Sequence, residues 1–315
     1  MMWQSHEPCY DVASAISQGG RDYQEDSIVA DFPHGSDSGF VVLADGMGGH
    51  AAGDVASKIV VTEVFSELKF QCASFSYNEN DIPTHLFDAA KSANECLLGE
   101  INSNPETLGM GSTLVSIVIR ENRLFWISIG DSPLYVLRDG KLEQLNEDHS
   151  MAPQIDFMVE SGMIDPETGK NHPDRNCLTS VLMGDVVAKI DCPKTPYELK
   201  IGDIILVSSD GLQFLEDEEI QQILVTHAES PSNEISGHLL EAIQVLDDPD
   251  QDNVSFSVIK VNNFDISKPM VVSKPIHPDH DKAHVGTTVA NLNQDLLDPV
   301  TNRAADVGGW FQRRR

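Results

Sequence analysis

The 315-residue sequence is poor in basic residues, aromatic residues and long apolar runs. It has 21 Lys and Arg against 50 Asp and Glu, so its formal net charge is −29. Nucleic acids and anionic membrane surfaces are bound through Lys and Arg, and this balance argues against both as partners. No stretch approaches the roughly 18 uninterrupted apolar residues of a membrane span. Residues 1–11 also lack the basic-then-apolar order of a signal peptide, so we expect no membrane segment.

Cysteine is scarce as well. An odd number of scattered cysteines without a CxxC pair indicates reduced thiols, and we therefore expect a cytoplasmic protein. With 40% hydrophobic and 23% charged residues, the composition predicts a folded globular chain, which we expect to be a monomer. The five cysteines are Cys9, Cys72, Cys96, Cys177 and Cys192.

The negative charge is confined to one part of the chain. Residues 263–315 hold seven Lys and Arg and six Asp, a sum of +1, which leaves −30 on residues 1–262. The tail contains four prolines and little helical periodicity. We therefore predict one folded domain over 1–262 and a flexible C-terminal tail over 263–315.

The pattern of apolar residues predicts the elements of this domain. Two short turns, at Glu121-Asn122 and Asp139-Gly140, join neighbouring strands as hairpins. Directly linked strands pair antiparallel, and separate runs of strands and helices favour an α+β fold. Residues 162–176, rich in Pro, Gly, Asp and Asn, are expected to be irregular. Helices are expected over 51–68, 86–101 (with a start at Asp81-Ile82-Pro83), 216–224 and 234–246, and strands over 10–17, 39–44, 112–119, 123–129, 134–137, 141–145, 204–208 and 254–261.

Several acidic residues stand at the ends of the expected strands. Any one of them is most simply explained as a turn residue. Together, beside glycines that allow close backbone approach, they have the composition of a site for a hard divalent cation such as Mg²⁺ or Mn²⁺. No phosphate-binding GxxxxGK[ST] loop, HExxH zinc motif or GxSxG nucleophile motif is present. The acids are Glu25, Asp26, Asp45, Asp131, Asp210 and Asp252.

Taken in order, these segments resemble the metal-dependent serine/threonine phosphatases of the protein phosphatase 2C type, and the bacterial branch in particular. Residues 20–26 (GRDYQED) resemble the opening segment of the family, and residues 44–49 (ADGMGG) resemble its DGMGG turn. The resemblance runs from about Ala13 to Val261 and leaves out the tail. The remaining family segments follow in order as Gly111-Ser112-Thr113, Gly130-Asp131-Ser132, Asp148-His149-Ser150, Ser209-Asp210-Gly211-Leu212 and Asp252-Asn253.

The resemblance implies both a fold and an activity. The fold would be a four-layer α-β-β-α sandwich, in which two antiparallel sheets are flanked by helices, with a flap at about 150–180. The activity would be hydrolysis of phosphoserine and phosphothreonine on proteins by a water or hydroxide that bridges two Mn²⁺ or Mg²⁺ ions. The partners implied are phosphorylated proteins and a cognate serine/threonine kinase system.

The resemblance also implies a set of metal ligands. Asp45 would bridge the two ions. Asp210 and Asp252 would complete one site, while Glu25 and the carbonyl of Gly46 would complete the other.

Three further roles follow from the same resemblance. Asp26 would hold water molecules of the metal site from behind, and Asp131, with Asp210, would form a weaker third site. Arg21 would bind the substrate phosphate through its planar, permanently charged guanidinium group. Arg21 and Asp45 are thus the implied catalytic pair.

The sequence departs from the family pattern at a few positions. Met47 stands where animal members carry a histidine that could donate a proton, which leaves a metal-bound water or His50 as the alternatives. Gln24 replaces an asparagine but keeps an amide, Pro133 replaces an arginine, and Gln213 replaces a small polar residue. Separately, we interpret His149 as a structural loop histidine rather than a catalyst.

Two other functions remain open from the sequence. A catalytically inactive, phosphatase-like module that binds phosphoproteins would share the fold, although all six acids are present. A metal-dependent phosphodiesterase or nuclease could use the same acids, but a charge of −30 on the body disfavours a nucleic-acid substrate. That charge also predicts a preference for phosphorylation sites flanked by Lys or Arg.

Overall fold

The computed structural model describes residues 8–34, 36–48, 52–72 and 78–264. The predicted flexible tail, apart from its first two residues, lies outside these ranges, as does His50. Within them, none of the helices combines the length and the apolar character that crossing a membrane requires.

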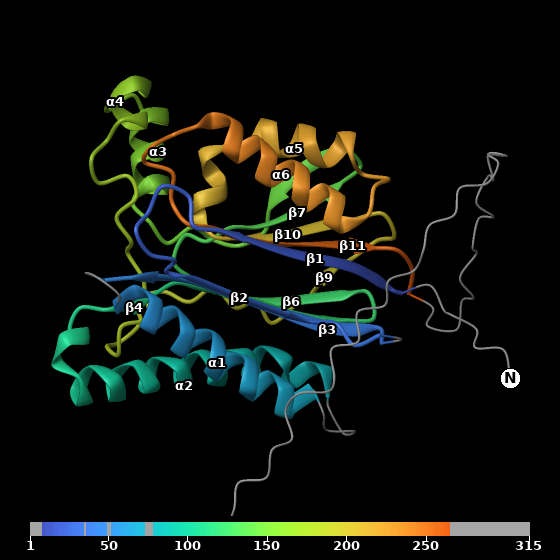
Figure 1. The fold of residues 1–315 in the computed structure, drawn as a ribbon, viewed down its shortest axis with the longest axis horizontal. Coiled ribbons are helices and arrows are strands. Elements are labelled where there is room, and N and C mark those ends of the chain that lie inside the picture. Colours follow the sequence, from blue (N-terminus) through green and yellow to red (C-terminus); the bar gives the residue numbers. More distant parts are fainter. Residues whose placement is uncertain (1–7, 35, 49–51, 73–77, 265–315) are drawn as a thin grey trace, which may run out of the picture. The chain divides into compact units, whose positions relative to one another are not determined.

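Two antiparallel sheets form the centre of the domain (Figure 1). The first has the strand order β1-β11-β10-β7-β8 and the second β2-β3-β5-β6-β9, with β4 paired to β3. The strands of the first sheet are β1 (Tyr10–Ser17), β7 (Leu134–Arg138), β8 (Lys141–Gln144), β10 (Ile204–Ser208) and β11 (Val254–Val261). Those of the second are β2 (Asp26–Asp31), β3 (Ser38–Met47), β4 (Gly111–Ser112), β5 (Leu114–Arg120), β6 (Arg123–Ile129) and β9 (Tyr197–Glu198).

Helices cover the outer face of each sheet. The pair α1 (Ala52–Cys72) and α2 (Ile82–Ser103) packs on the second sheet, and the pair α5 (Asp217–Thr226) and α6 (Ser232–Leu246) packs on the first. Two shorter helices, α3 (Ala152–Glu160) and α4 (Pro166–Lys170), lie at one end of the sheets, outside both helical layers (Figure 1). Single 3₁₀ turns occur at Glu79–Asp81, Pro105–Thr107 and Asp210–Phe214. The expected four-layer α-β-β-α sandwich is thus confirmed.

Central strands such as β3 and β5 read as continuous apolar runs because both of their faces are buried. On β3, Val42 belongs to the core layer that also contains Leu86 of α2, whereas its neighbour Leu43 belongs to the layer between the two sheets, with Ile205. Successive side chains of a strand point to opposite faces, so one strand serves two core layers. A third layer, between the first sheet and its helices, includes Leu206, Leu239 and Phe256.

Both expected hairpins are present. Strands β5 and β6 pair from Arg120 opposite Arg123, and β7 and β8 pair from Arg138 opposite Lys141. The second turn has positive φ at Asp139 (53°) and Gly140 (78°). This conformation matches the twist of the strands and favours Asp-Gly.

The expected Asp81-Ile82-Pro83 start of the second helix is confirmed, because α2 begins at Ile82 and Pro83 fits its first turn. One expectation about regular structure needs correction. The segment 162–176 is not irregular throughout, since α4 forms over Pro166–Lys170. Its N-cap, Asp165, accepts a hydrogen bond from the backbone N–H of Thr168 at 3.0 Å, which stabilises the first turn.

Candidate active site

A cavity of about 290 Å³ opens where strand ends of both sheets meet. In the second sheet the antiparallel register pairs Asp26, at the start of β2, with Asp45 near the end of β3. In the first sheet it pairs Ser208, the last residue of β10, with Phe256 near the start of β11. Acids at the ends of these strands therefore lie close together and line the cavity. The lining includes Arg21, Glu25, Asp45, Gly46, Met47, Asp131, Asp210 and Asp252.

Asp45 is held in place through its backbone. Its N–H donates to Oγ1 of Thr113 at 3.0 Å, and its carbonyl accepts from the N–H of Thr113 at 2.8 Å and from the Ser112 hydroxyl at 3.0 Å. The Thr113 hydroxyl also lies 2.8 Å from Oγ of Ser132, which follows Asp131. Thr113 thus fixes the positions of two of the acids relative to each other.

Glycine is required after two of the acids because other backbone segments approach closely. A Cβ on Gly46 would overlap the carbonyl oxygen of Gly53, and a Cβ on Gly211 would overlap that of Asn253. The sequence Asp-Gly at 45–46 and 210–211 is therefore a packing requirement as well as a turn signal.

Asp26 lies behind the cavity rather than in its lining. Its carboxyl is buried, with 3% exposure, and Oδ2 accepts a hydrogen bond from the Ser209 hydroxyl at 2.7 Å. Ser209 in turn donates its N–H to the carbonyl of Ser255 at 2.8 Å. Asp26 therefore connects β2 to the residue that precedes Asp210.

The loop that carries Arg21 and Glu25 is held by one amide side chain. Asn253 accepts the N–H of Glu25 at 2.7 Å and donates to the carbonyls of Gln18 and Tyr23 at 2.8 and 3.0 Å. An amide has both donors and an acceptor, whereas a carboxylate in this position would lack the donors. Asn253 thus places the loop beside Asp252.

Arg21 and Asp252 form an ion pair across the mouth of the cavity. Nη2 of Arg21 lies 2.6 Å from Oδ2 of Asp252, and the two side chains are 54% and 29% exposed. The guanidinium group is therefore next to the acids and open to solvent, within reach of an anion that enters the cavity.

Burial and mutual repulsion raise the pKa of the acids at this site. Burial, followed by the charges of Asp26, Asp210 and Asp131, holds the pKa of Asp45 well above its usual range. Burial is also the main cause that raises the pKa of Asp26 to about 7 and that of Asp131 to about 8. The pKa values of Asp210 and Glu25 are raised by burial too, and Asp252 adds to both shifts. Such a cluster favours a bound cation.

The residues fit a hard divalent cation. Three buried carboxyl oxygens, Oε1 of Glu25, Oδ1 of Asp26 and Oδ1 of Asp210, have no hydrogen-bond partner among the described residues. In the described ranges no three His, Cys, Asp or Glu side chains stand as a ready ligand set. Asp252 is paired with Arg21. Carboxylate oxygens are nevertheless the ligands that Mn²⁺ and Mg²⁺ take.

The structure brings the predicted residues together and adds a few more. All of the predicted positions line the cavity except Asp26, which supports it from behind. Asn176 and Leu178, from the predicted flap, also line it, and Leu178 was not identified from the sequence. Met47 lines the cavity with 39% exposure, and its thioether has no proton to donate.

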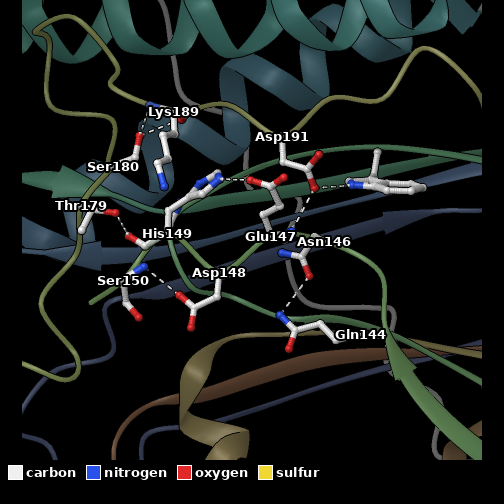
Figure 2. A network of polar contacts seen from close by, with 12 residues as sticks. Gln144, Asn146, Glu147, Asp148, His149, Ser150, Thr179, Ser180, Lys189 and Asp191 are labelled. Carbon is white, nitrogen blue, oxygen red and sulfur yellow. Dashed lines mark hydrogen bonds and ion pairs between the residues drawn. The ribbon is translucent and has the colours of Figure 1, made fainter. Parts of the chain in front are cut away.

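His149 is a buried link between the cavity and the flap (Figure 2). The ring Nδ1 of His149 accepts a hydrogen bond from the backbone N–H of Gly130 at 3.3 Å, and the backbone N–H of His149 donates to the Gly130 carbonyl at 3.0 Å. Its carbonyl accepts from the N–H and the hydroxyl of Thr179 at 2.7 and 2.8 Å.

The surroundings of His149 disfavour its charged form. Nε2 lies 3.9 Å from Oε2 of Glu147, beyond hydrogen-bond distance. Burial lowers the pKa of His149; the charge of Glu147 opposes this shift, and that of Lys189 adds to it. The interpretation of His149 as a structural residue agrees with these contacts, because the ring does not line the cavity.

Comparison with known proteins places these features in a family. The sequence profile described as "Protein phosphatase 2C" matches residues 19–243. The serine/threonine protein phosphatase PstP of Mycobacterium tuberculosis is 31% identical over 284 residues, which cover 87% of this chain and 51% of PstP. The serine/threonine phosphatase stp of Listeria monocytogenes is 33% identical over 185 residues, covering 58% of this chain and 71% of stp.

Solved structures agree with the sequence comparison. A crystal structure of the catalytic domain of PstP in complex with two manganese ions matches with a TM-score of 0.64 and 31% identity. The match covers 81% of this chain and 99% of that one. The chain thus spans about half of the length of full PstP and nearly all of its crystallised catalytic domain.

Proposed function

The chain belongs to the protein phosphatase 2C family, and on this premise we propose that it hydrolyses phosphoserine and phosphothreonine on proteins with two Mn²⁺ or Mg²⁺ ions. One observation carries the proposal: Arg21 shares a cavity of about 290 Å³ with a set of carboxyl groups. A guanidinium group binds phosphate through charge-assisted hydrogen bonds, and hard divalent ions prefer oxygen ligands such as carboxylates. The carboxyl groups are those of Glu25, Asp45, Asp131, Asp210 and Asp252.

Five residues would hold the two principal ions. Asp45 would serve both, Asp210 and Asp252 would complete one site, and Glu25 with the Gly46 carbonyl would complete the other. When bound, the two ions would supply a nucleophilic water and neutralise charge on the phosphoryl oxygens.

The neighbouring residues would orient this set. Thr113 fixes the backbone of Asp45, and Asp26 would orient water from behind the cavity while Ser209 holds its carboxyl in place. Asp131 would form a weaker third cation site together with Asp210. These assignments rest on the positions of the side chains and on the family resemblance.

Arg21 would bind the phosphate of the substrate. Its guanidinium is half exposed and is tied to Asp252 by a single ion pair of 2.6 Å. A planar group with five donors can exchange this partner for two oxygens of a phosphate. Since Met47 has no proton to give, the serine or threonine oxygen that leaves would take its proton from water in the cavity.

The biological setting belongs to the same proposal. The substrates would be proteins phosphorylated on serine or threonine by a cognate kinase system. We further propose that the protein is a monomer and acts in the cytoplasm.

The proposal is tested by comparing three substrates with and without Mn²⁺. We expect release of phosphate from a phosphothreonyl peptide and hydrolysis of a chromogenic phosphate monoester, both lost on addition of a chelator. A phosphodiester of the same chromophore should be cleaved far more slowly. The peptide and the two esters should be assayed at the same pH and ionic strength.

The outcomes separate the rival functions. Binding of the phosphopeptide without any turnover in Mn²⁺ or Mg²⁺ would favour the inactive binding module. Faster cleavage of the diester than of the monoester would favour a phosphodiesterase. Either result would overturn the assignment.

A further inference from the structure

A second, larger hollow adjoins the cavity. It is a groove of about 700 Å³, and Asp131 and Asp210 line both spaces. The groove is lined by the segment that contains α3 and α4 and by the start of α5. At its inner end is the buried carboxyl of Asp210, whose Oδ1 lacks a hydrogen-bond partner within the described ranges. A ligand that occupies the groove would therefore extend directly from the reactive centre.

The groove is strongly acidic even apart from the two shared aspartates. Five other acids line it against two cations, Lys170 and Arg175, which leaves a net charge of −3. The acids come from both walls: one set precedes and enters α3, and the other begins α5. They are Asp148, Asp156, Glu216, Asp217 and Glu218.

Both cations of the groove are bound to acids of its own walls. Nζ of Lys170, the last residue of α4, lies 3.0 Å from Oε1 of Glu216, just before α5. Arg175 makes two hydrogen bonds to the carboxylate of Asp156, at 2.7 and 3.0 Å. The Lys170–Glu216 pair joins the two walls and is about 70% exposed on each side, so it is a weak pair that another cation could replace.

The wall at the start of α5 is fixed by a buried tyrosine. The hydroxyl of Tyr135 donates to Oδ1 of Asp217 at 2.9 Å and lies 3.1 Å from Nε2 of Gln213. Gln213, where a smaller residue was expected, thus connects the turn after Asp210 to α5. The acids of this wall are therefore held at a constant distance from the reactive centre.

We propose that this groove binds the residues that flank the phosphorylated serine or threonine and selects lysine or arginine there. A basic side chain of the substrate takes the place of Lys170 at Glu216 and lies near Glu218. This inference rests on the proposed phosphatase function. It assigns the preference for Lys or Arg beside the phosphorylated residue, which the charge of residues 1–262 predicts, to this groove.

The test measures discrimination between peptides rather than activity alone. Three phosphothreonyl peptides, identical except for Arg, Ala or Glu at the second and third positions on both sides, are assayed at low salt. We expect kcat/KM to be about tenfold or more higher for the Arg peptide than for the Glu peptide. This ratio, kcat/KM of the Arg peptide over that of the Glu peptide, should shrink in high salt. Each rate is normalised to hydrolysis of the chromogenic monoester.

Two variants should move this ratio in opposite directions. Glu218→Lys should lower it about three- to tenfold, because it places a cation in the groove, and Lys170→Gln should raise it about two- to threefold by freeing Glu216. Glu234→Lys is the matched control: it makes the same charge change in the first turn of α6, away from the groove, and should leave the ratio unchanged.

The failure of this inference is distinct from failure of the proposed function. If the wild type hydrolyses all three peptides and the monoester at equal relative rates, or if Glu234→Lys alters the ratio as much as Glu218→Lys, the groove does not select basic residues. If neither peptides nor monoester are hydrolysed, the phosphatase function itself is wrong.

Discussion

At the scale of single residues, the site is defined by charged groups that are paired with each other. Arg21, proposed to bind phosphate, contacts Asp252, proposed to bind a metal ion. The two residues are 231 positions apart, and Asn253 brings them together by holding the loop that carries Arg21. The same arginine should therefore affect both substrate binding and metal binding, in opposite directions.

This dual role predicts a specific result for Arg21→Ala. The KM for a phosphopeptide should rise about tenfold, since a charge-assisted, two-point contact with the phosphate is lost. The Mn²⁺ concentration for half-maximal activity should fall about two- to fivefold, because a neighbouring cation is removed and Asp252 is released. Arg21→Lys should retain the charge effect on Mn²⁺ but lose most of the two-point contact.

Steady-state titrations of peptide and of Mn²⁺ with both variants check this prediction. A rise in both constants for Arg21→Ala would mean that Arg21 supports the metal site rather than competing with it.

At the scale of elements, local signals identified most strands and helices, whereas contacts between distant segments had to come from the structure. Asp139-Gly140 indicates its hairpin because the two residues favour the positive φ values that the turn needs. The N-cap of α4 at Asp165 is also a local signal, but the helix was not predicted because the surrounding Pro and Gly residues favour irregular structure. By contrast, nothing near Asn253 or Ser209 in the sequence reveals which backbone or carboxyl group each one holds.

The acids of the site were predictable in their identity but not in their contacts. Their positions at strand ends and beside glycines can be seen in the sequence, so the acids that line the cavity could be named in advance. Their pairings could not, since the register of β2 with β3 and the side-chain contacts of Arg21 depend on the packed sheets. Leu178 was missed because the flap has neither strand periodicity nor a turn motif at this position.

The contacts of His149 predict how two substitutions at this position change the stability of the folded protein. His149→Leu leaves the Gly130 N–H buried without an acceptor and should lower the free energy of unfolding by about 1–3 kcal/mol near pH 7.5. His149→Asn, whose amide oxygen can take the place of Nδ1, should lower it less.

The sign of the pH effect follows from the lowered pKa of His149. The unfolded chain binds a proton at this residue more readily than the folded protein does, so the wild type loses stability as the pH falls through about 6.5. The difference in unfolding free energy between wild type and His149→Leu should therefore narrow from pH 7.5 to pH 5.5. Denaturant unfolding at both pH values measures this difference, and a difference that widens would contradict a lowered pKa of His149.

At the scale of the whole molecule, part of the net charge of −29 is concentrated at the candidate site and in the groove beside it. Four aspartates at the site have raised pKa values, all with burial as the main cause. Two divalent ions would offset only four negative charges. The rest of the acidic surface includes the groove beside the cavity, where it bears on the choice of substrate.

The raised pKa values predict how Mn²⁺ stabilises the protein. Without metal, the folded protein holds protons at Asp26 up to about pH 7 and at Asp131 up to about pH 8, whereas unfolded aspartate loses them near pH 3.9. Stability from these groups is thus lost as the pH rises from about 4 to about 8. Mn²⁺ should restore it and should raise the thermal midpoint more at pH 8 than at pH 5.5.

A hundredfold excess of Mn²⁺ over its Kd would add about 2.7 kcal/mol to the free energy of unfolding. Thermal unfolding with Mn²⁺ or with a chelator, at both pH values, gives the comparison. An equal shift at pH 5.5 and pH 8 would show that the metal does not bind at this cluster.

The most direct test of the phosphatase assignment is Mn²⁺-dependent release of phosphate from a phosphothreonyl peptide by Asp45→Asn. This change keeps the size and the backbone contacts of Asp45 but removes the carboxylate proposed to serve both ions. We predict a loss of about a thousandfold or more in kcat/KM with an unchanged circular dichroism spectrum. Asp88→Asn, on the exposed face of α2, should retain wild-type activity. Turnover by Asp45→Asn at the wild-type rate would contradict the assignment.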